Sequence, residues 1–475
     1  GLFSGINLTS LGNKDFFIQK HDSTGALIWS TSFGGFEDDE VLGMDLNAEA
    51  EVYVCGVTEG SMYFDTLLLE NTDGKNGFLT KLNPQGMPIW TLNMESNDEI
   101  EVNDVVANIN GNSYIVGKFK DSAYIDSIAF SSFGSESLFV SKISDSGQVI
   151  WVKIFSSQDQ VNPERITLGN ADEIYLTGSF EGNLLVEGNI LSNTSNSDFF
   201  LIKLDSLGDV LWSKSAGGSD DINSEGLVVD QNGNTFLIGY FEDQAYFLTD
   251  TLISQDDKDG FLVKLDSSGN ELWVKSFQGN SDVCPKDICI DSDTNVYVTG
   301  SIESSTLFDT LLISNTSGID LFVAKFNNNG EILWGKGVGG TDDIESFSIV
   351  CDPFKNPVIC GSFKGSSYFD TIIVNGFNEN DFFISKIYPG SEALGILNLI
   401  QDRHINLYPN PTSEYLQIQK EDEDTDNLNV EIRDLKGRLM KYFKSDSSQS
   451  FWVGDLKPGT YFLNIKNSST PFIKL

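Results

Sequence analysis

Residues 198–218 read DFFLIKLDSLGDVLWSKSAGG, and markers of this stretch return along the chain at a constant interval. A lysine, a tryptophan and a glycine of the preceding predicted strand each recur every 61 residues, with no insertion or deletion. The lysines are Lys20, Lys81, Lys142, Lys203, Lys264, Lys325 and Lys386. The tryptophans are Trp29, Trp90, Trp151, Trp212, Trp273 and Trp334, and the glycines are Gly56, Gly117, Gly178, Gly239, Gly300 and Gly361. Three markers in one register identify an array of repeats.

Each period predicts short strands joined by turns. In one period the predicted strands are 225–230, 235–241, 259–265 and 271–275, with a less regular extended piece at 245–253. Turns of the Asp-x-x-Gly type, such as 266–269, stand where hairpins need them. Since no stretch keeps a helical period of 3.6 residues, we expect an all-β protein almost without helices.

Repeats of about four antiparallel strands favour a β-propeller over an open solenoid. Residues 1–35 hold only the late strands of a unit, and residues 341–388 hold only the early ones and the strand of Lys386. Split units of this kind lock the ring of closed propellers, so we expect the two ends to share a blade. Counting the lysine strands favours seven blades, with six or eight as alternatives.

The order Asp-x-Phe-x-x-Lys, Asp-x-x-Gly, Trp and Gly-Gly, seen from Asp198 through Trp212 to Gly217-Gly218, resembles the bacterial β-propeller repeat of surface proteins in Bacteroidota-type bacteria. The resemblance covers about residues 1–390. It implies a fold and a cell-surface setting, and it implies no defined activity.

The net charge of the chain limits the classes of partner that it can bind. The chain has 475 residues, with 70 Asp and Glu against 30 Lys and Arg, for a formal net charge of −40. This surface repels nucleic acid and anionic lipid, which we exclude as partners, and it attracts cations such as Ca²⁺. No apolar run is long enough for a transmembrane helix. The chain opens Gly1-Leu-Phe with neither an initiator Met nor a signal peptide, which we interpret as a processed or truncated product.

The period stops after Lys386. We predict a propeller at residues 1–388, a linker at 389–402 and a small immunoglobulin-like β-sandwich at 403–475. Four short elements occur in order in this tail: Tyr408-Pro409-Asn410-Pro411, Asp434-Leu-Lys-Gly437-Arg438, Leu456-Lys-Pro458-Gly459-Thr-Tyr461 and Phe472-Ile-Lys474-Leu475.

Together these elements resemble the type A C-terminal sorting domain of the type IX secretion system. The resemblance implies export across the outer membrane by the type IX machinery, and location at the outer-membrane surface or outside the cell. It also implies that the domain is usually removed, with the rest of the chain anchored or released.

Catalytic motifs are scarce in the sequence. The two histidines, His21 and His404, offer no Ser–His–Asp or Cys–His pair within the repeats, and neither zinc spacing nor a phosphate-binding glycine loop is present. We therefore predict no catalytic or cofactor-binding residue.

Carboxylates follow each tryptophan strand and would lie at one rim of a propeller. Candidate Ca²⁺ ligands among them are Asp38, Asp39, Asp220, Asp221, Asp282, Asp342 and Asp343. A solvated acidic loop and a catalytic carboxylate pair are the two other interpretations.

The repeated lysines and tryptophans are predicted to be architectural, the tryptophans as wedges between blades. Aspartates at the start of the lysine strands, such as Asp198 and Asp259, are possible lysine partners. The five cysteines allow a local bridge, either Cys351–Cys360 or Cys284–Cys289, although free buried thiols fit this chain better.

Equal repeat lengths bear on function, because propeller enzymes usually build their sites from unequal loops. We therefore expect an extracellular binding, adhesion or scaffold module, whose ligand is a polysaccharide or a surface protein. A secreted polysaccharide-degrading enzyme with a carboxylate pair in the channel is one alternative, favoured if the channel residues are unequal. A passive structural surface protein is the other.

Overall fold

The structure is a computed structural model, in which every element of the described residues is a β-strand. The chain divides into two compact units, Gly1–Gly395 and Ile396–Leu475. The structure describes residues 2–387 except 4–5, 9, 24, 66, 72–73, 317, 370–371 and 377–379, and residues 406–408, 415–419, 428–434, 438–445, 450–465 and 468–474. The predicted linker lies outside these ranges. Within them, no helix is long and apolar enough to cross a membrane.

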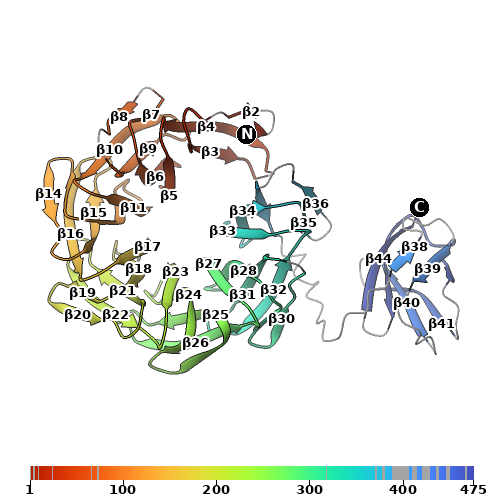
Figure 1. Cartoon of the computed structure of the whole chain (residues 1–475). Helices are drawn as coiled ribbons and strands as arrows, with labels where there is room; N and C mark the ends of the chain where they lie inside the picture. Colours follow the sequence, from red (N-terminus) through yellow and green to blue (C-terminus); the bar gives the residue numbers. More distant parts are fainter. Residues whose placement is uncertain are drawn as a thin grey trace. The chain divides into compact units, whose positions relative to one another are not determined.

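The first unit is a β-propeller, as predicted, with its sheets arranged in a ring (Figure 1). The innermost strands are β5 (Asp39–Leu46), β11 (Ile100–Ala107), β17 (Val161–Leu168), β23 (Ile222–Val229), β27 (Val283–Ile290) and β33 (Ile344–Cys351). The second strands are β6 (Val52–Thr58), β12 (Ser113–Phe119), β18 (Ile174–Phe180), β24 (Thr235–Tyr246), β28 (Val296–Ile302) and β34 (Pro357–Phe363).

The third strands carry the repeated lysines: β3 (Phe16–His21), β9 (Asn76–Leu82), β15 (Glu136–Ile143), β21 (Asp198–Leu204), β25 (Thr251–Leu265), β31 (Asp320–Phe326) and β37 (Asp381–Lys386). The fourth strands carry the tryptophans: β4 (Leu27–Gly35), β10 (Pro88–Ser96), β16 (Val149–Ser157), β22 (Val210–Ala216), β26 (Glu271–Gln278) and β32 (Ile332–Val338). The lysine strands number seven, in seven successive sheets of the ring.

The irregular piece of each repeat forms an outer hairpin that joins the preceding blade. Five of these hairpins are β7 (Met62–Phe64) with β8 (Leu67–Leu69), β13 (Ser122–Ile125) with β14 (Ile128–Ser131), β19 (Asn183–Val186) with β20 (Asn189–Ser192), β29 (Thr306–Phe308) with β30 (Leu311–Ile313), and β35 (Ser366–Phe369) with β36 (Ile372–Asn375). The sixth is formed by the end of β24 and the start of β25, where Ala245 pairs with Leu252. For example, β13 lies between β12 and β15 in the chain, yet it pairs with β10 of the blade before. The hairpin thus extends the repeat to 61 residues and links adjacent blades.

The expectation that the two ends share one blade is wrong for the described residues. At the N-terminal end, β3 and β4 form their own sheet with β7 and β8, and at the C-terminal end β33, β34 and β37 form a separate sheet. The ends instead meet through the rings of Phe17 and Phe382, whose centroids are 5.8 Å apart in an edge-to-face arrangement. The short strands β1 (Leu2–Phe3) and β2 (Ile6–Asn7) precede this ring.

The hydrophobic core of the ring lies between its blades. One cluster joins Tyr114 of β12 and Leu138 of β15 to residues of the next sheet, Leu176 of β18 and Phe200 of β21. All four side chains have no exposed area. Because alternate side chains of each strand face the two neighbouring sheets, every internal blade is buried on both faces.

The second unit is a small β-sandwich. One sheet contains β38 (Asn406–Tyr408), β39 (Tyr415–Gln419) and β42 (Ser450–Trp452). The other contains β40 (Leu428–Asp434), β41 (Leu439–Ser445), β43 (Gly459–Ile465) and β44 (Ser468–Lys474). Leu416 and Phe451 of the first sheet share a core with Val430 and Leu463 of the second. Its likeness to an immunoglobulin domain stays a prediction.

Candidate functional site

The acidic loops predicted from sequence each precede an innermost strand. Their backbone is fixed in the same way from repeat to repeat, because the residue three positions after the repeated glycine donates its N–H to a carbonyl of the loop. Glu59 donates to Asp38 at 3.0 Å, Glu242 to Asp221 at 2.9 Å and Lys364 to Asp343 at 2.9 Å. This bond brings the side chain of the donor residue beside the loop carboxylates.

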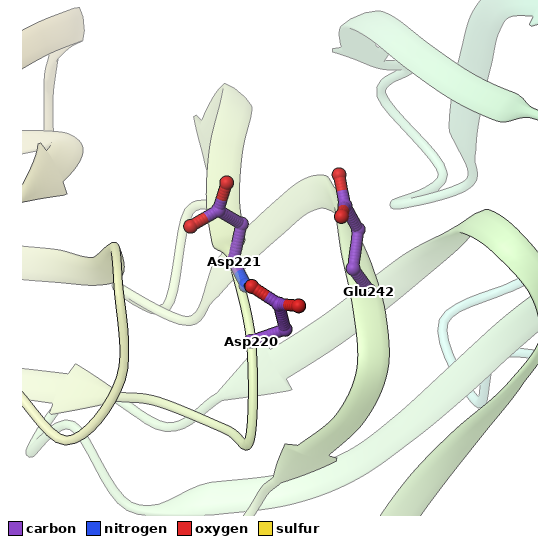
Figure 2. A group of neighbouring side chains, drawn as sticks. All are labelled: Asp220, Asp221 and Glu242. Atoms are coloured by element: carbon purple, nitrogen blue, oxygen red, sulfur yellow. The ribbon is translucent and has the colours of Figure 1, made fainter.

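One of these loops gathers three carboxylates. Asp220 and Asp221 precede β23, and Glu242 lies on β24, with ligand oxygens that all fall within 4.8 Å of one another. Figure 2 shows the three side chains standing next to one another. Among the described residues this is the only such group of three possible metal ligands. Carboxylate oxygens are the ligands that Ca²⁺ prefers, so the donor set fits this ion.

Burial and mutual repulsion raise the pKa values of two of these carboxylates. Burial, and then the charge of Asp220, raise the pKa of Asp221 above its ordinary value. Burial likewise raises the pKa of Glu242, against the opposing effect of Lys258, whose Nζ lies 3.8 Å from Oε1 of Glu242. A bound divalent cation would offset the repulsion and favour the charged forms.

The other predicted ligands have local protein partners, as does Asp220, which accepts a hydrogen bond from the side-chain amide of Asn196 at 2.8 Å. Asp38 accepts the backbone N–H of Lys14 at 3.2 Å, and the buried Asp39 accepts that of Gly35 at 2.6 Å. Asp282 accepts a long bond, 3.4 Å, from the N–H of Lys258. In the last loop, Asp342 accepts the N–H of Asp343 at 3.0 Å, and Asp343 pairs with Lys364 at 3.3 Å. Sequence reasoning missed Glu242, although the 61-residue register places glutamates at Glu59, Glu181 and Glu303 too.

A polar pocket of about 470 Å³ lies at the equivalent loop two repeats earlier. It is lined by Glu70, Asn71, Gly74, Asn76, Glu95, Ser96, Asn97, Asp98 and Tyr124. Asn76 is 4% exposed, and its Oδ1 atom accepts no hydrogen bond from any described residue. Tyr124, on β13, is 43% exposed.

The repeats differ at this place. In another repeat Asp198 and Gly217 occupy the positions of Asn76 and Glu95, and there a Cβ added to Gly217 would lie 2.3 Å from the Asp198 carboxylate. The aspartate therefore fills the space over the glycine. Asn76 and Glu95 cannot pack in this way, and the pocket occurs where they replace the Asp–Gly pair.

The innermost strands carry unlike residues at one repeated position. Each has a β-bulge at the same repeat position, and the extra residues are Leu42, Asn103, Glu164, Glu225, Lys286 and Phe347. Glu225 pairs with Lys286 at 3.0 Å. Burial, followed by the nearby charge of Glu225, raises the pKa of Glu164 to about 7. Bulges often re-aim side chains next to functional sites.

The repeated lysines and tryptophans bind the next blade. Lys20 Nζ and Trp29 Nε1 both donate to the carbonyl oxygen of Pro84, at 3.2 and 3.1 Å. Lys203 and Trp212 both reach the carbonyl of Ser267 in the same way, at 3.5 and 3.2 Å. These contacts support the architectural role that we propose for both series.

Asp198, at the start of a lysine strand, bonds to the loop before that strand. Asp198 accepts hydrogen bonds from the N–H of Thr194 at 2.8 Å and from the hydroxyl of Ser195 at 2.9 Å. Lys203, on the same strand, pairs instead with Glu173 at 2.9 Å. The aspartate therefore holds the loop before its own strand.

Neither predicted local disulfide is present, and all five cysteines are free thiols in the structure. In the β33–β34 pair Cys351 lies opposite Pro357 and Cys360 opposite Ser348. In the β27–β28 pair Cys284 lies opposite Ser301, and Cys289 opposite Tyr297. The register therefore keeps both pairs apart.

Several of the predicted sorting residues fall on the strands of the second unit. Tyr408 ends β38, Gly459 and Tyr461 lie on β43, and Lys474 ends β44. Pro458 directly precedes β43, and the Tyr461 hydroxyl donates to the carbonyl of Lys457 at 2.9 Å. Pro409, Asn410, Pro411 and Gly437 lie outside the described residues.

Known proteins similar to this chain were compared with it. It is 21% identical over 462 residues to an uncharacterized WD repeat-containing protein of Acanthamoeba polyphaga mimivirus, covering 79% of this chain and 32% of the viral protein. The chain thus spans about a third of the length of that relative.

Among solved structures, the chain is similar to the Pan2 WD40 domain of Neurospora crassa (8% identity, TM-score 0.31, 67% of this chain and 85% of that one). It is also similar to PorZ, a bacterial surface component of the type IX secretion system of Porphyromonas gingivalis (11% identity, TM-score 0.19, 95% and 83%).

The tail has a family match of its own. Residues 406–474 match the family described as the secretion system C-terminal sorting domain. This confirms the predicted identity of the tail and its partner, the type IX secretion machinery. The protein is therefore a β-propeller that carries a C-terminal sorting domain and is exported by type IX secretion to the cell surface or the extracellular space.

Proposed function

We propose that the exported propeller is an extracellular binding module for polysaccharide, with Ca²⁺ as an accessory ion. The polar pocket at the acidic rim carries this proposal. Its amide, carboxylate and hydroxyl groups provide both donors and acceptors for sugar hydroxyls, and Tyr124 offers an exposed aromatic face. The buried oxygen of Asn76, which lacks a described partner, is an acceptor that a ligand hydroxyl would satisfy.

The carboxylates of Asp220, Asp221 and Glu242 are the residues that we propose to hold Ca²⁺. Two other repeats have a lysine at the position of Glu242, which indicates that a positive charge beside the loop carboxylates is favourable. Lys120 pairs with Glu99 at 2.9 Å, and Lys364 pairs with Asp343 at 3.3 Å. The repeat with Glu242 lacks that built-in ammonium at the same position.

The test is binding of the full chain to a polysaccharide array, with Ca²⁺ and again with EDTA. We expect Tyr124→Ala to weaken binding at least about tenfold, the equivalent of about 1.4 kcal/mol. Tyr63→Ala is the matched control, since Tyr63 holds the equivalent position on β7 and does not line the pocket. Equal binding by wild type and Tyr124→Ala would contradict the pocket, and absence of any binding would favour a surface-protein ligand or a passive structural role.

A second candidate is a secreted polysaccharide-degrading enzyme, and the unlike bulge residues favour it. Glu164, with its pKa near 7, would be the proton donor, and Glu225, which pairs with Lys286, would be the second carboxylate. Under this reading, polysaccharides release new reducing ends, and Glu164→Gln abolishes the release while binding persists. Binding without any product would leave the binding module as the function.

A further inference from the structure

Two cysteines meet across the interface of the last two sheets of the ring. Cys289 on β27 and Cys351 on β33 place their Sγ atoms 2.7 Å apart. Cys289 is 8% exposed and belongs to a core cluster against which Cys351 packs. The two residues are 62 positions apart, so each comes from the innermost strand of a different repeat.

The same positions hold apolar pairs at other blade interfaces. The 61-residue register puts Val228 and Ile290 at one equivalent interface and Val106 and Leu168 at another. Each pair packs against the core cluster of its own interface. At these two interfaces the place is filled by two aliphatic side chains, whereas two thiols in contact can also form a covalent bond.

We propose that Cys289 and Cys351 form a disulfide in the exported protein, which joins β27 to β33. The two thiols lose two protons and two electrons, one S–S bond forms, and an oxidant of the protein-disulfide class is reduced to its dithiol. Disulfides persist in the oxidising compartments that an exported chain passes through and reaches. Burial, and then the neighbouring Cys351, raise the pKa of the Cys289 thiol well above its ordinary value. Since the thiolate is the reactive form, we expect oxidation before the two blades have closed over the pair.

The position of the proposed disulfide indicates how it would stabilise the ring. The sheet of β33, β34 and β37 has three strands and is the last of the ring, where the chain meets the N-terminal sheet through an aromatic contact. A disulfide to β27 ties this incomplete blade to a complete one. It also shortens the unfolded chain by closing a long loop, which favours the folded ring.

Alkylation under denaturing conditions without reductant, followed by intact-mass measurement, tests the bond on the exported protein. We expect three of the five cysteines to be alkylated, and all five after reduction. Loss of the sorting domain does not change this count, because every cysteine lies in the propeller. Peptide mapping should recover Cys289 joined to Cys351.

The double variant Cys289→Val/Cys351→Ile is the matched control, because it copies the Val228–Ile290 pair and keeps the interface filled. We expect its three remaining cysteines to be alkylated with and without reductant. Reductant should lower the melting temperature of wild type and leave that of the control unchanged. Five alkylated cysteines in the unreduced wild-type protein, or a bond mapped to another pair, would overturn the proposal.

Discussion

The loops before β23 and β33 share one backbone arrangement and differ in the charge that completes them. In both, the residue three positions after the repeated glycine donates its N–H to an aspartate carbonyl at 2.9 Å. That residue is Lys364 before β33, and a backbone bond from Ile319, helped by Lys364, lowers the pKa of Asp343. It is Glu242 before β23, and the pKa of the equivalent Asp221 is raised. The side chain at this position thus changes the charge of the loop, from a lysine paired with Asp343 to a third carboxylate beside Asp220 and Asp221.

The largest expected effect comes from Glu242→Lys, which gives the β23 loop the charge of the β33 loop. If wild type binds Ca²⁺ there, Ca²⁺ at a hundred times its Kd stabilises the fold by about 2.7 kcal/mol. We expect the variant to lose this gain, because the ammonium replaces the ion. Thermal melts with Ca²⁺ and with EDTA measure it, and an undiminished Ca²⁺ response in the variant would refute the site.

Lys364→Glu makes the opposite exchange. The variant loses the ion pair with Asp343 and gathers carboxylates before β33, so in EDTA we expect a loss of up to about 1 kcal/mol, as for a partly exposed pair. Ca²⁺ should then stabilise this variant more than wild type. Isothermal titration calorimetry should show one additional binding event, and a titration identical to wild type would argue that the loop geometry does not suit the ion.

A pH titration sharpens the same comparison. Because the folded pKa values of Asp221 and Glu242 are raised, the folded state holds more protons than the unfolded state between the ordinary and raised values. Their contribution to stability is full below the ordinary carboxyl pKa and is lost as pH rises through the raised one. Denaturant unfolding of wild type against Asp221→Asn/Glu242→Gln should show a steeper decline for wild type in EDTA, and Ca²⁺ should flatten it. Parallel curves in EDTA would contradict the raised values.

The repeat was sufficient to predict the propeller, because Lys, Trp and Gly markers in one register leave little freedom of fold. The repeat did not predict that the segment 245–253 and its equivalents pair with the preceding blade. The residue pattern of one repeat does not indicate which neighbouring repeat its strands pair with. The closure of the ring was mispredicted for a related reason, as β37 completes its own sheet with β34.

Only part of the candidate site could be predicted from the sequence, because it too depends on contacts between segments far apart in the chain. Asp220 and Asp221 stand out in the sequence, but Glu242 joins them only through the backbone bond that brings β24 to the loop. The contact of Cys289 with Cys351 likewise needs the knowledge that positions 62 residues apart meet between blades. Local spacing suggests only bridges near one hairpin, and the strand register keeps both of those pairs apart.

The smallest expected effect belongs to the next loop, before β27, and it tests whether acidity alone suffices. Asp282 and Glu303 hold the positions of Asp221 and Glu242, and the Glu303 N–H again donates to the Asp282 carbonyl, at 3.0 Å. The position before Asp282 is Ser281, whose hydroxyl donates to Glu303 at 3.0 Å. With one carboxylate fewer and a hydroxyl already bound, this loop should hold Ca²⁺ poorly. We expect Asp282→Asn/Glu303→Gln to change stability by less than about 0.5 kcal/mol with or without Ca²⁺, as for an ordinary surface substitution. A Ca²⁺ response that fell as far in this variant as in Glu242→Lys would mean that general acidity attracts the ion, and that three clustered carboxylates are not required.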